Sequence, residues 1–186
     1  MIFLYRILVA HPLGHNWLSS NLFNHEHCMT TGLKKIISGG QTGADRAALD
    51  AAIASAIPHG GWLPRGRKTE DGPLDKRYLL QEIPSEYYRD RTHKNILESD
   101  GTVIITYGPL TGGSALTEAL AIRHDRPCLL LNLEYIPIPN AVKALRQWLH
   151  EHDITLLNVA GPRASGEPQI YKAVYTIISS LCRQDQ

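Results

Sequence analysis

The sequence predicts an α/β fold, a three-layer sandwich in which helices cover both faces of a mostly parallel sheet. From residue 33 onward, apolar strands alternate with amphipathic helices, the rhythm that gives parallel sheets. The strands are continuous apolar runs, as expected when both faces of a strand are buried. The chain has 186 residues, of which 43% are hydrophobic and 20% charged, enough to bury a core without disulfides.

Each expected element follows from its local pattern. Apolar runs predict strands at 33–38, 102–107, 127–133 and 154–159, and a further short strand at 60–63. Helices are expected at 45–56, 88–99, 114–124 and 140–152. The first should place Leu49, Ile53 and Ile57 on one face, and its many alanines should allow close packing. A last helix carries a stripe spaced by three and four residues: Tyr171, Val174, Tyr175, Ile178 and Leu181.

Residues 1–28 differ from the rest, because they hold one basic and one acidic residue but four of the nine histidines. We expect them to form a poorly ordered extension, and residues 29–186 to form a single ligand-binding domain. The four histidines show no helical pairing or cysteine spacing typical of a metal centre, so we expect no metal site.

Composition excludes several kinds of partner. Lys and Arg number 19 against 18 Asp and Glu, so no basic field predicts binding to duplex nucleic acid. No apolar run approaches the roughly 20 residues that span a bilayer, so no membrane partner is expected. Three distant cysteines, Cys28, Cys128 and Cys182, predict neither disulfides nor a zinc knuckle and favour a cytoplasmic location. We also expect a homo-oligomer.

The strongest local motif is the glycine-rich turn of residues 38–46, Ser-Gly-Gly-Gln-Thr-Gly-Ala-Asp-Arg, between a strand and a helix. Such a turn exposes backbone N–H groups at a helix N-terminus, where anions and phosphates bind. The alternative is a turn needed only for packing the strand on the helix. The spacing matches neither the dinucleotide fingerprint nor a Walker A loop.

A second glycine-rich turn, Gly108 to Glu118, also joins a strand to a helix. If the two strands are neighbours, both turns face one crevice at the carboxyl edge of the sheet. Glu118 is either a general acid/base or ligand anchor, or an acid that complements the helix dipole. Tyr107 could stack on a flat ring, although core packing is the commoner use of such a tyrosine.

A basic cluster, Arg65, Arg67 and Lys68, lies in the long polar loop that follows residue 63. Arginine binds phosphate and other oxyanions through two parallel hydrogen bonds, but a solvated loop is equally compatible with this pattern. Residues 158–163, Asn-Val-Ala-Gly-Pro-Arg, either form a rim of the crevice or, as we favour, a simple turn.

These motifs resemble the molybdenum carrier family. The likeness covers residues 33–182 and is carried by the stretch 36–50, by Pro58 to Trp62, by Glu70-Asp71-Gly72, and by the segments 99–102, 110–117 and 157–163. It implies a Rossmann-like fold of the superfamily that also holds the lysine-decarboxylase-like phosphoribohydrolases, and a nucleotide-like or molybdenum cofactor ligand between the two turns. The residues implied for that site are Gly39, Gly40, Gln41, Thr42, Gly43, Thr111, Gly112, Gly113 and Ser114.

The phosphoribohydrolases carry a glutamate one position later than Glu118, where this chain has Ala119. A shift of one residue turns a helical side chain by about 100°. We therefore expect a carrier of molybdenum cofactor or molybdate, a phosphorylated anionic small molecule, rather than an enzyme. A phosphoribohydrolase-like nucleotide hydrolase and a nucleotide sensor are the alternatives. Further candidate ligand-binding residues are Asp45, Arg46, Arg65, Lys68, Tyr107 and Glu118.

Overall fold

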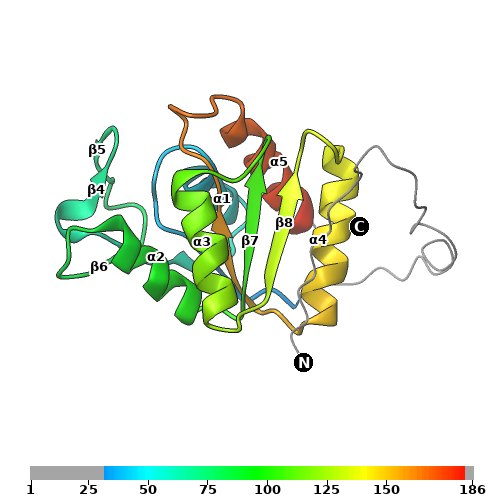
Figure 1. Cartoon of the computed structure of the whole chain (residues 1–186), viewed down its shortest axis with the longest axis horizontal. Coiled ribbons are helices and arrows are strands. Elements are labelled where there is room, and N and C mark those ends of the chain that lie inside the picture. Colours follow the sequence, from blue (N-terminus) through cyan, green and yellow to red (C-terminus); the bar gives the residue numbers. More distant parts are fainter. Residues whose placement is uncertain (1–31, 183–186) are drawn as a thin grey trace, which may run out of the picture.

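The computed structural model describes residues 32–182, and at their centre lies a sheet of five parallel strands (Figure 1). Across the sheet the order is β2 (His59–Gly60), β1 (Lys35–Ile37), β9 (Leu156–Ala160), β7 (Gly101–Thr106) and β8 (Cys128–Asn132). In register, Ile36 lies opposite Leu157, and Val103 lies opposite both Val159 and Leu129. The strands predicted at 33–38, 102–107, 127–133 and 154–159 are confirmed.

Helices cover both faces of this sheet, so the predicted three-layer arrangement is confirmed. On one face lie α1 (Ala44–Ala54), α4 (Ile138–Glu151) and α5 (Ile170–Cys182), with α5 packed between the other two. On the other face lie α2 (Tyr88–Leu97) and α3 (Gly112–Arg123), which pack against each other (Figure 1).

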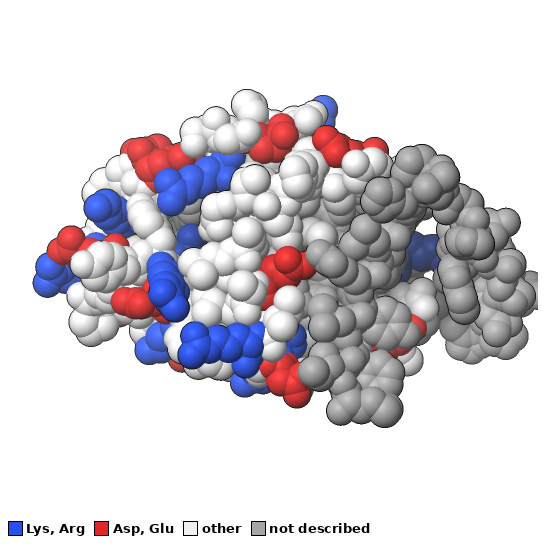
Figure 2. Space-filling view, in the orientation of Figure 1, with Lys and Arg blue, Asp and Glu red and all other residues white. Residues whose placement is uncertain are grey.

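The surface carries charges of both signs. Basic and acidic side chains lie side by side over the face shown in Figure 2, rather than in one broad patch of a single sign. Among residues 32–182, no helix is long and apolar enough to cross a membrane. The extension expected over residues 1–28 lies outside the described part of the chain.

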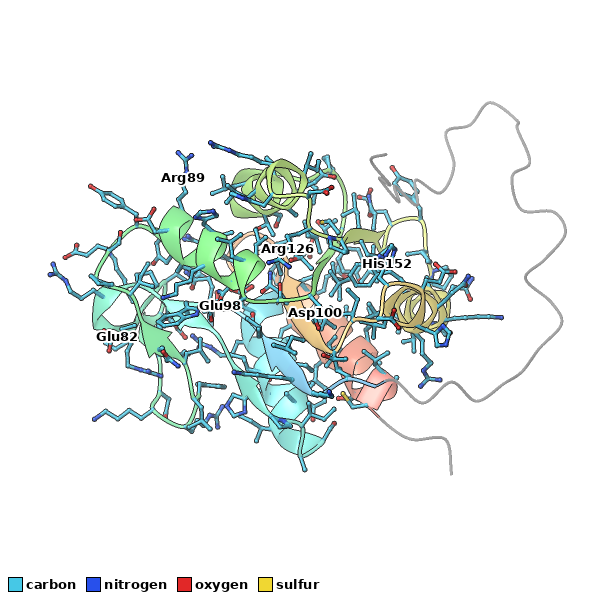
Figure 3. All side chains as sticks on the ribbon, turned by 90° about the horizontal axis from the view of Figure 1, so that it is seen from below. Glu82, Arg89, Glu98, Asp100, Arg126 and His152 are labelled. Atoms are coloured by element: carbon cyan, nitrogen blue, oxygen red, sulfur yellow. The ribbon has the colours of Figure 1, made fainter. Side chains whose placement is uncertain are left out.

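At the amino ends of β7 and β9, one carboxylate joins the two strands. Asp100 Oδ2 accepts hydrogen bonds from Thr155 N at 2.9 Å, Thr155 Oγ1 at 3.0 Å and Leu156 N at 2.8 Å. Arg126 lies close to Asp100, and its Nη2 donates to the carbonyl of Leu97 (Figure 3). Burial alone would raise the pKa of Asp100, but these hydrogen bonds outweigh it and hold the pKa below its usual value.

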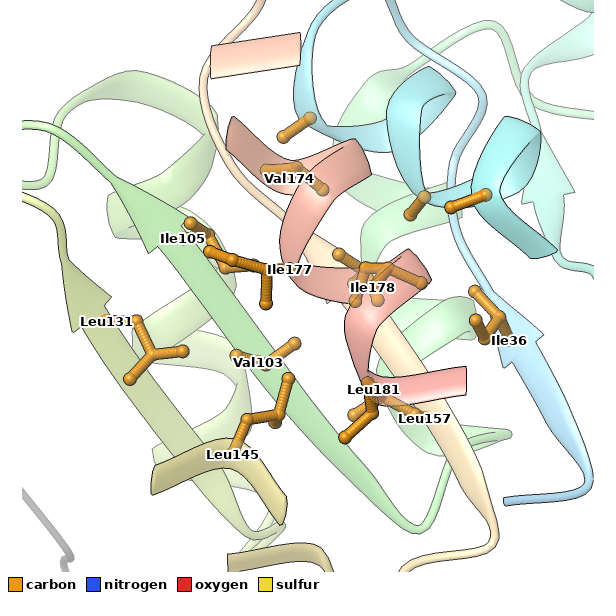
Figure 4. Packing of buried hydrophobic residues seen from close by; sticks show 14 of the residues in the cluster. Ile36, Val103, Ile105, Leu131, Leu145, Leu157, Val174, Ile177, Ile178 and Leu181 are labelled. Atoms are coloured by element: carbon orange, nitrogen blue, oxygen red, sulfur yellow. The ribbon is translucent and has the colours of Figure 1, made fainter. Parts of the chain in front are cut away.

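The main core lies between the sheet and α5. Figure 4 shows side chains of β1, β7, β8 and β9 meeting one face of α5, with α4 alongside. The members labelled there are Ile36, Val103, Ile105, Leu131, Leu145, Leu157, Val174, Ile177, Ile178 and Leu181. Of the stripe predicted for this helix, Tyr171 is exposed, and its hydroxyl donates to Asp50 at 2.7 Å.

Helix α1 packs through its alanines, as the sequence suggests. The face that carries Leu49 and Ile53 is only partly buried, because Leu49 is fully buried and Ile53 is 42% exposed. The inner face consists mainly of alanines, which let α1 approach α5 closely: Ala44, Ala47, Ala48, Ala51 and Ala52. Leu49 instead packs beneath the polar loop, in a small cluster with Leu63 and Leu74.

The short strand expected at 60–63 is in fact two strands. The chain turns at Gly61, whose φ of +130° is one that glycine adopts readily, and an added Cβ there would lie 2.1 Å from the carbonyl oxygen of Ser38. His59–Gly60 joins the main sheet as β2. Trp62–Leu63, β3, pairs instead with β6 (Gln81–Glu82).

Between β3 and β6 the chain makes a 3-10 turn, η1 (Arg65–Arg67), and a hairpin of β4 (Lys68–Thr69) and β5 (Gly72–Pro73). Arg67 holds this segment between β3 and β6 together. Its guanidinium donates to the carbonyls of Leu74, Asp75, Tyr78 and Leu80 at 2.8, 2.9, 3.0 and 3.2 Å. The guanidinium of Arg67, a member of the basic cluster, therefore binds carbonyl groups of the protein's own backbone.

Candidate functional site

A cavity of about 440 Å³ lies at the carboxyl ends of β1, β7 and β9, a size suited to a small-molecule ligand. Helices α2 and α3 and the segment after β9 complete its walls. Its lining includes Gly39, Gln41 and Asp45 from the first turn, Tyr107, Thr111, Gly112, Gly113 and Ser114 from the second, Tyr88, Arg91, Thr92 and Asn95 from α2, and residues 158–163 and 165–167.

The two glycine turns do not meet directly, because β9 lies between β1 and β7. The chain leaving β9 therefore passes over the first turn. Ala44 N donates to Pro162 O at 3.1 Å, and a Cβ on Gly43 would lie 2.5 Å from that same oxygen. Residues 162–164 of the same chain therefore cover the N-terminal end of α1.

Other polar groups of the first turn are also paired within the protein. Gln41 N donates to Asp45 Oδ2 at 3.3 Å, and Thr42 N donates to Gln41 Oε1 at 3.0 Å. The Thr42 hydroxyl donates to Glu70, whose carboxylate also accepts the Ser165 hydroxyl at 2.7 Å. These hydrogen bonds lower the pKa of Glu70. In the structure, these polar groups of the turn hydrogen-bond to the protein's own chain.

The second turn is open. Helix α3 starts at Gly112 without a side-chain cap, and Gly112 and Gly113 are exposed on the cavity wall. A Cβ added to either glycine would meet nothing within 4 Å. The first N–H groups of a helix lack partners within the helix and carry a partial positive charge. The turn at Gly112–Gly113 is therefore the part of the site with room for an anion.

A buried ion pair forms the floor of the cavity. Arg91 Nη1 lies 3.0 Å from Asp45 Oδ2, and the two side chains are only 13% and 7% exposed. The guanidinium rests on Gly39, where a Cβ would lie 1.2 Å from Arg91 Nη1. Gly39 thus makes room for an arginine of α2, and Arg91 Nε remains without an acceptor in the structure.

Gln41 is a second buried donor in the cavity wall. The residue is 3% exposed, and its Oε1 accepts N–H groups from Thr42 and from Glu70, the latter at 2.9 Å. These two hydrogen bonds fix the orientation of the amide. Gln41 Nε2 is therefore a donor, and within the described residues it has no acceptor.

Tyr88 and Arg163 line the cavity together. The guanidinium carbon of Arg163 lies 4.9 Å from the centroid of the Tyr88 ring, a cation–π distance. The segment 158–163, for which we favoured a simple turn, therefore contributes to the cavity. The charged residues of the lining are Asp45, Arg91, Arg163 and Glu167, a formal charge of zero.

Seven of the predicted site residues lie outside the cavity lining: Gly40, Thr42, Gly43, Arg46, Arg65, Lys68 and Glu118. Arg46 forms a two-pronged ion pair with Asp71, at 2.5 and 3.0 Å, which holds the β4–β5 hairpin and strongly lowers the pKa of Asp71. Arg65 is exposed and pairs with Glu86. Glu118 lies near Cys128, whose pKa is raised to about 12 by burial and by that carboxylate.

Sequence reasoning missed the residues of α2 that line the cavity. Tyr88, Arg91 and Asn95 follow one another at helical spacing, but in the sequence they sit in a polar run without a motif. Among the described residues, no group of three or more His, Cys, Asp or Glu side chains could hold a metal ion.

This parallel sheet with a ligand-sized cavity at its carboxyl edge defines a Rossmann-like α/β protein. The family model of the circularly permutated YpsA SLOG family, cpYpsA, matches residues 36–182. The chain belongs to this family. None of the curated proteins compared with the chain matches it.

Among solved structures, the chain is similar to the crystal structure of the "Putative molybdenum carrier protein" from Syntrophus aciditrophicus SB. The two sequences are 50% identical, the match covers 81% of this chain and 96% of that chain, and the TM-score is 0.80. The resemblance to the molybdenum carrier family and the Rossmann-like fold are thereby confirmed.

Proposed function

We propose that the chain is a molybdenum carrier that binds its cargo in this cavity, either as the phosphorylated molybdenum cofactor or as molybdate. The observation that carries the proposal is the open N-terminus of α3 in a cavity that also contains buried donors without acceptors. The name of the similar protein from Syntrophus supports molybdenum as the cargo.

Unpaired donors favour a ligand rich in acceptors. A buried donor that lacks a partner costs about 1–3 kcal/mol. Gln41 Nε2 and Arg91 Nε are two such donors in the lining. Phosphate or molybdate oxygens reaching them would remove this cost, whereas an apolar ligand would leave it in place.

The anion is bound by directed groups rather than by a wide positive field, since the charges of the lining balance. Arg91 is already neutralised by Asp45, so Arg163 is the basic residue of the lining best placed to approach a ligand. Together with the N–H groups of Gly112 and Gly113, it provides donors for a single phosphate or oxyanion.

The aromatic side chains of Tyr88 and Tyr107, which both line the cavity, favour a ligand that has a flat ring beside its anion. A pterin satisfies this requirement, and so does a nucleobase, so a nucleotide ligand is the second candidate. Hydrolysis of a nucleotide by Glu118 has less support, since this carboxylate lies outside the cavity lining.

The test measures the cargo directly. Protein purified from its own host is analysed for molybdenum by mass spectrometry and for pterin by fluorescence, and apo-protein is titrated with molybdate. Arg163→Ala should weaken binding about tenfold or more, because it removes a charge-assisted contact. Arg65→Ala is the matched control, because Arg65 is basic but lies outside the cavity lining.

Protein without molybdenum or pterin, and unable to bind molybdate, would overturn the molybdenum proposal. The same apo-protein is then titrated with a panel of nucleoside monophosphates, and release of free base is followed by chromatography. Binding without turnover would favour a nucleotide sensor, and turnover lost in Glu118→Gln would favour the hydrolase. Native mass spectrometry of the same sample tests the homo-oligomer that we also propose.

A further inference from the structure

Two histidines far apart in the sequence meet where α2 packs against α3. His93 lies in α2, and His124 is the C-cap residue of α3. Their Nε2 atoms are 2.8 Å apart, so one imidazole hydrogen-bonds to the other, and their ring centroids are 4.5 Å apart with the planes inclined by 37°. Neither residue lines the cavity, so this pair is independent of the proposed function.

We propose that His93 and His124 form a binding site for a divalent transition-metal ion that prefers right-angled nitrogen ligands, Cu²⁺ above Ni²⁺. With metal–nitrogen bonds of about 2.0–2.1 Å, two cis ligands at a right angle are about 2.8–3.0 Å apart. The two Nε2 atoms already have this separation. Tetrahedral Zn²⁺ would need about 3.3 Å and therefore a movement of the two helices.

The orientation of the rings also fits a shared ion. The centroids are only 1.7 Å farther apart than the nitrogens (4.5 Å against 2.8 Å), so the rings are tilted from the line between the nitrogens, as in a cis pair of ligands, rather than aligned end to end. Both imidazoles would coordinate through Nε2 with the proton on Nδ1. Water completes the coordination, because among the described residues no third His, Cys, Asp or Glu joins the pair.

Some of the surrounding charges repel a bound cation and others attract it. Arg123 and Arg126 lie close to His124. The same arginines repel a cation. The carbonyl groups at the C-terminus of α3 attract it, because that helix end carries partial negative charge.

A bound ion would fasten α2 to α3. Helix α2 supplies Arg91 to the cavity, and α3 begins at Gly112, the open glycine turn. The ion would therefore link two walls of the cavity from outside it.

Copper titration of the full-length chain tests the site, with Cu²⁺ affinity measured by calorimetry. The background variant carries Asn at the four N-terminal histidines, so that these do not compete for the ion: His11, His15, His25 and His27. In this background, His93→Gln or His124→Gln should weaken Cu²⁺ binding about tenfold or more, because chelation by two linked ligands is lost. His150→Gln, which removes an exposed histidine of α4, is the matched control and should bind as the background does.

A second measurement keeps the test decisive if a histidine variant folds poorly, as judged by circular dichroism. Arg123→Gln leaves both ligands in place and removes one repelling charge, so it should strengthen Cu²⁺ binding about two- to fivefold. Electron paramagnetic resonance of the Cu²⁺ complex should show two imidazole nitrogens in the background chain and one in either histidine variant. Equal affinities in all variants, or a spectrum without two nitrogens, would overturn the proposal.

Discussion

Gly39 and Arg91 explain at the scale of single residues why the first turn is rich in glycine. The guanidinium of Arg91 occupies the space where a side chain of residue 39 would begin, and there it reaches Asp45. In the sequence, Gly39 was a candidate ligand-binding residue. In the structure, it brings the backbone close to an arginine of another helix.

Gly39→Ala should therefore destabilise the protein by about 1–3 kcal/mol, because Arg91 must leave its place and the buried pair with Asp45 is weakened. Urea unfolding measures the change. Gly113→Ala is the matched control, since a Cβ there meets nothing within 4 Å, and it should change the stability by no more than about 0.5 kcal/mol. Equal effects of both substitutions would contradict this explanation.

At the scale of elements, Arg67 and a small apolar cluster together hold the long segment between β3 and β6 in place. Arg67 satisfies carbonyls along residues 74–80, and Leu74 and Leu80 pack with Leu49 of α1. From the sequence, Arg67 was one of three similar basic residues. Only the path of the loop separates its role from that of Arg65.

Arg67→Ala should lower the free energy of unfolding by about 2 kcal/mol, since four carbonyls, three of them in partly buried hydrogen bonds, lose a charged donor. It should also speed proteolysis within residues 74–80, which limited digestion followed by mass spectrometry detects. Arg65→Ala, at a side chain that is 66% exposed, should leave both quantities nearly unchanged. A stable, protease-resistant Arg67→Ala variant would count against this role.

Asp100 makes a comparable contribution to the amino ends of β7 and β9, and its contribution depends on pH. Because its folded pKa lies below the unfolded value of about 3.9, ionisation stabilises the fold above that pH. The stabilisation is lost as the pH falls through the lower, folded pKa. Asp100→Asn should therefore cost about 1–2 kcal/mol at pH 7.

The difference between the wild type and Asp100→Asn should shrink as the pH falls below about 4, because the wild-type carboxyl then becomes neutral as well. Urea unfolding of both proteins at a series of pH values measures this difference in the free energy of unfolding. A difference that stays constant between pH 7 and pH 3 would show that the charge of Asp100 plays no part.

At the scale of the whole molecule, the order of the strands decides the form of the site. Because β9 is inserted between β1 and β7, the segment after β9 covers the first glycine turn and leaves the second one open. Both turns look equivalent in the sequence. β9 pairs with both β1 and β7, but the segment that leaves β9 lies over the first turn, where the carbonyl of Pro162 accepts the N–H of Ala44.

The same topology predicts a gradient of local stability. β7 is buried at all six positions and is paired on both sides, whereas β2 is a two-residue strand at the edge of the sheet. Hydrogen exchange followed by mass spectrometry should therefore be slowest in β7 and β9 and faster by orders of magnitude in β2. Exchange in β2 as slow as that in β7 would contradict this order.

The sequence by itself determined the α/β class, the main strands and helices, the two glycine turns and the family resemblance. These features depend on local periodicity and on motifs, which act over a few residues. The tertiary structure decided which candidates share one cavity. It brought in Arg91 and Arg163, excluded Arg65 and Glu118 from the lining, and joined His93 to His124. Contacts between distant segments depend on strand order and helix packing, and no local pattern encodes these.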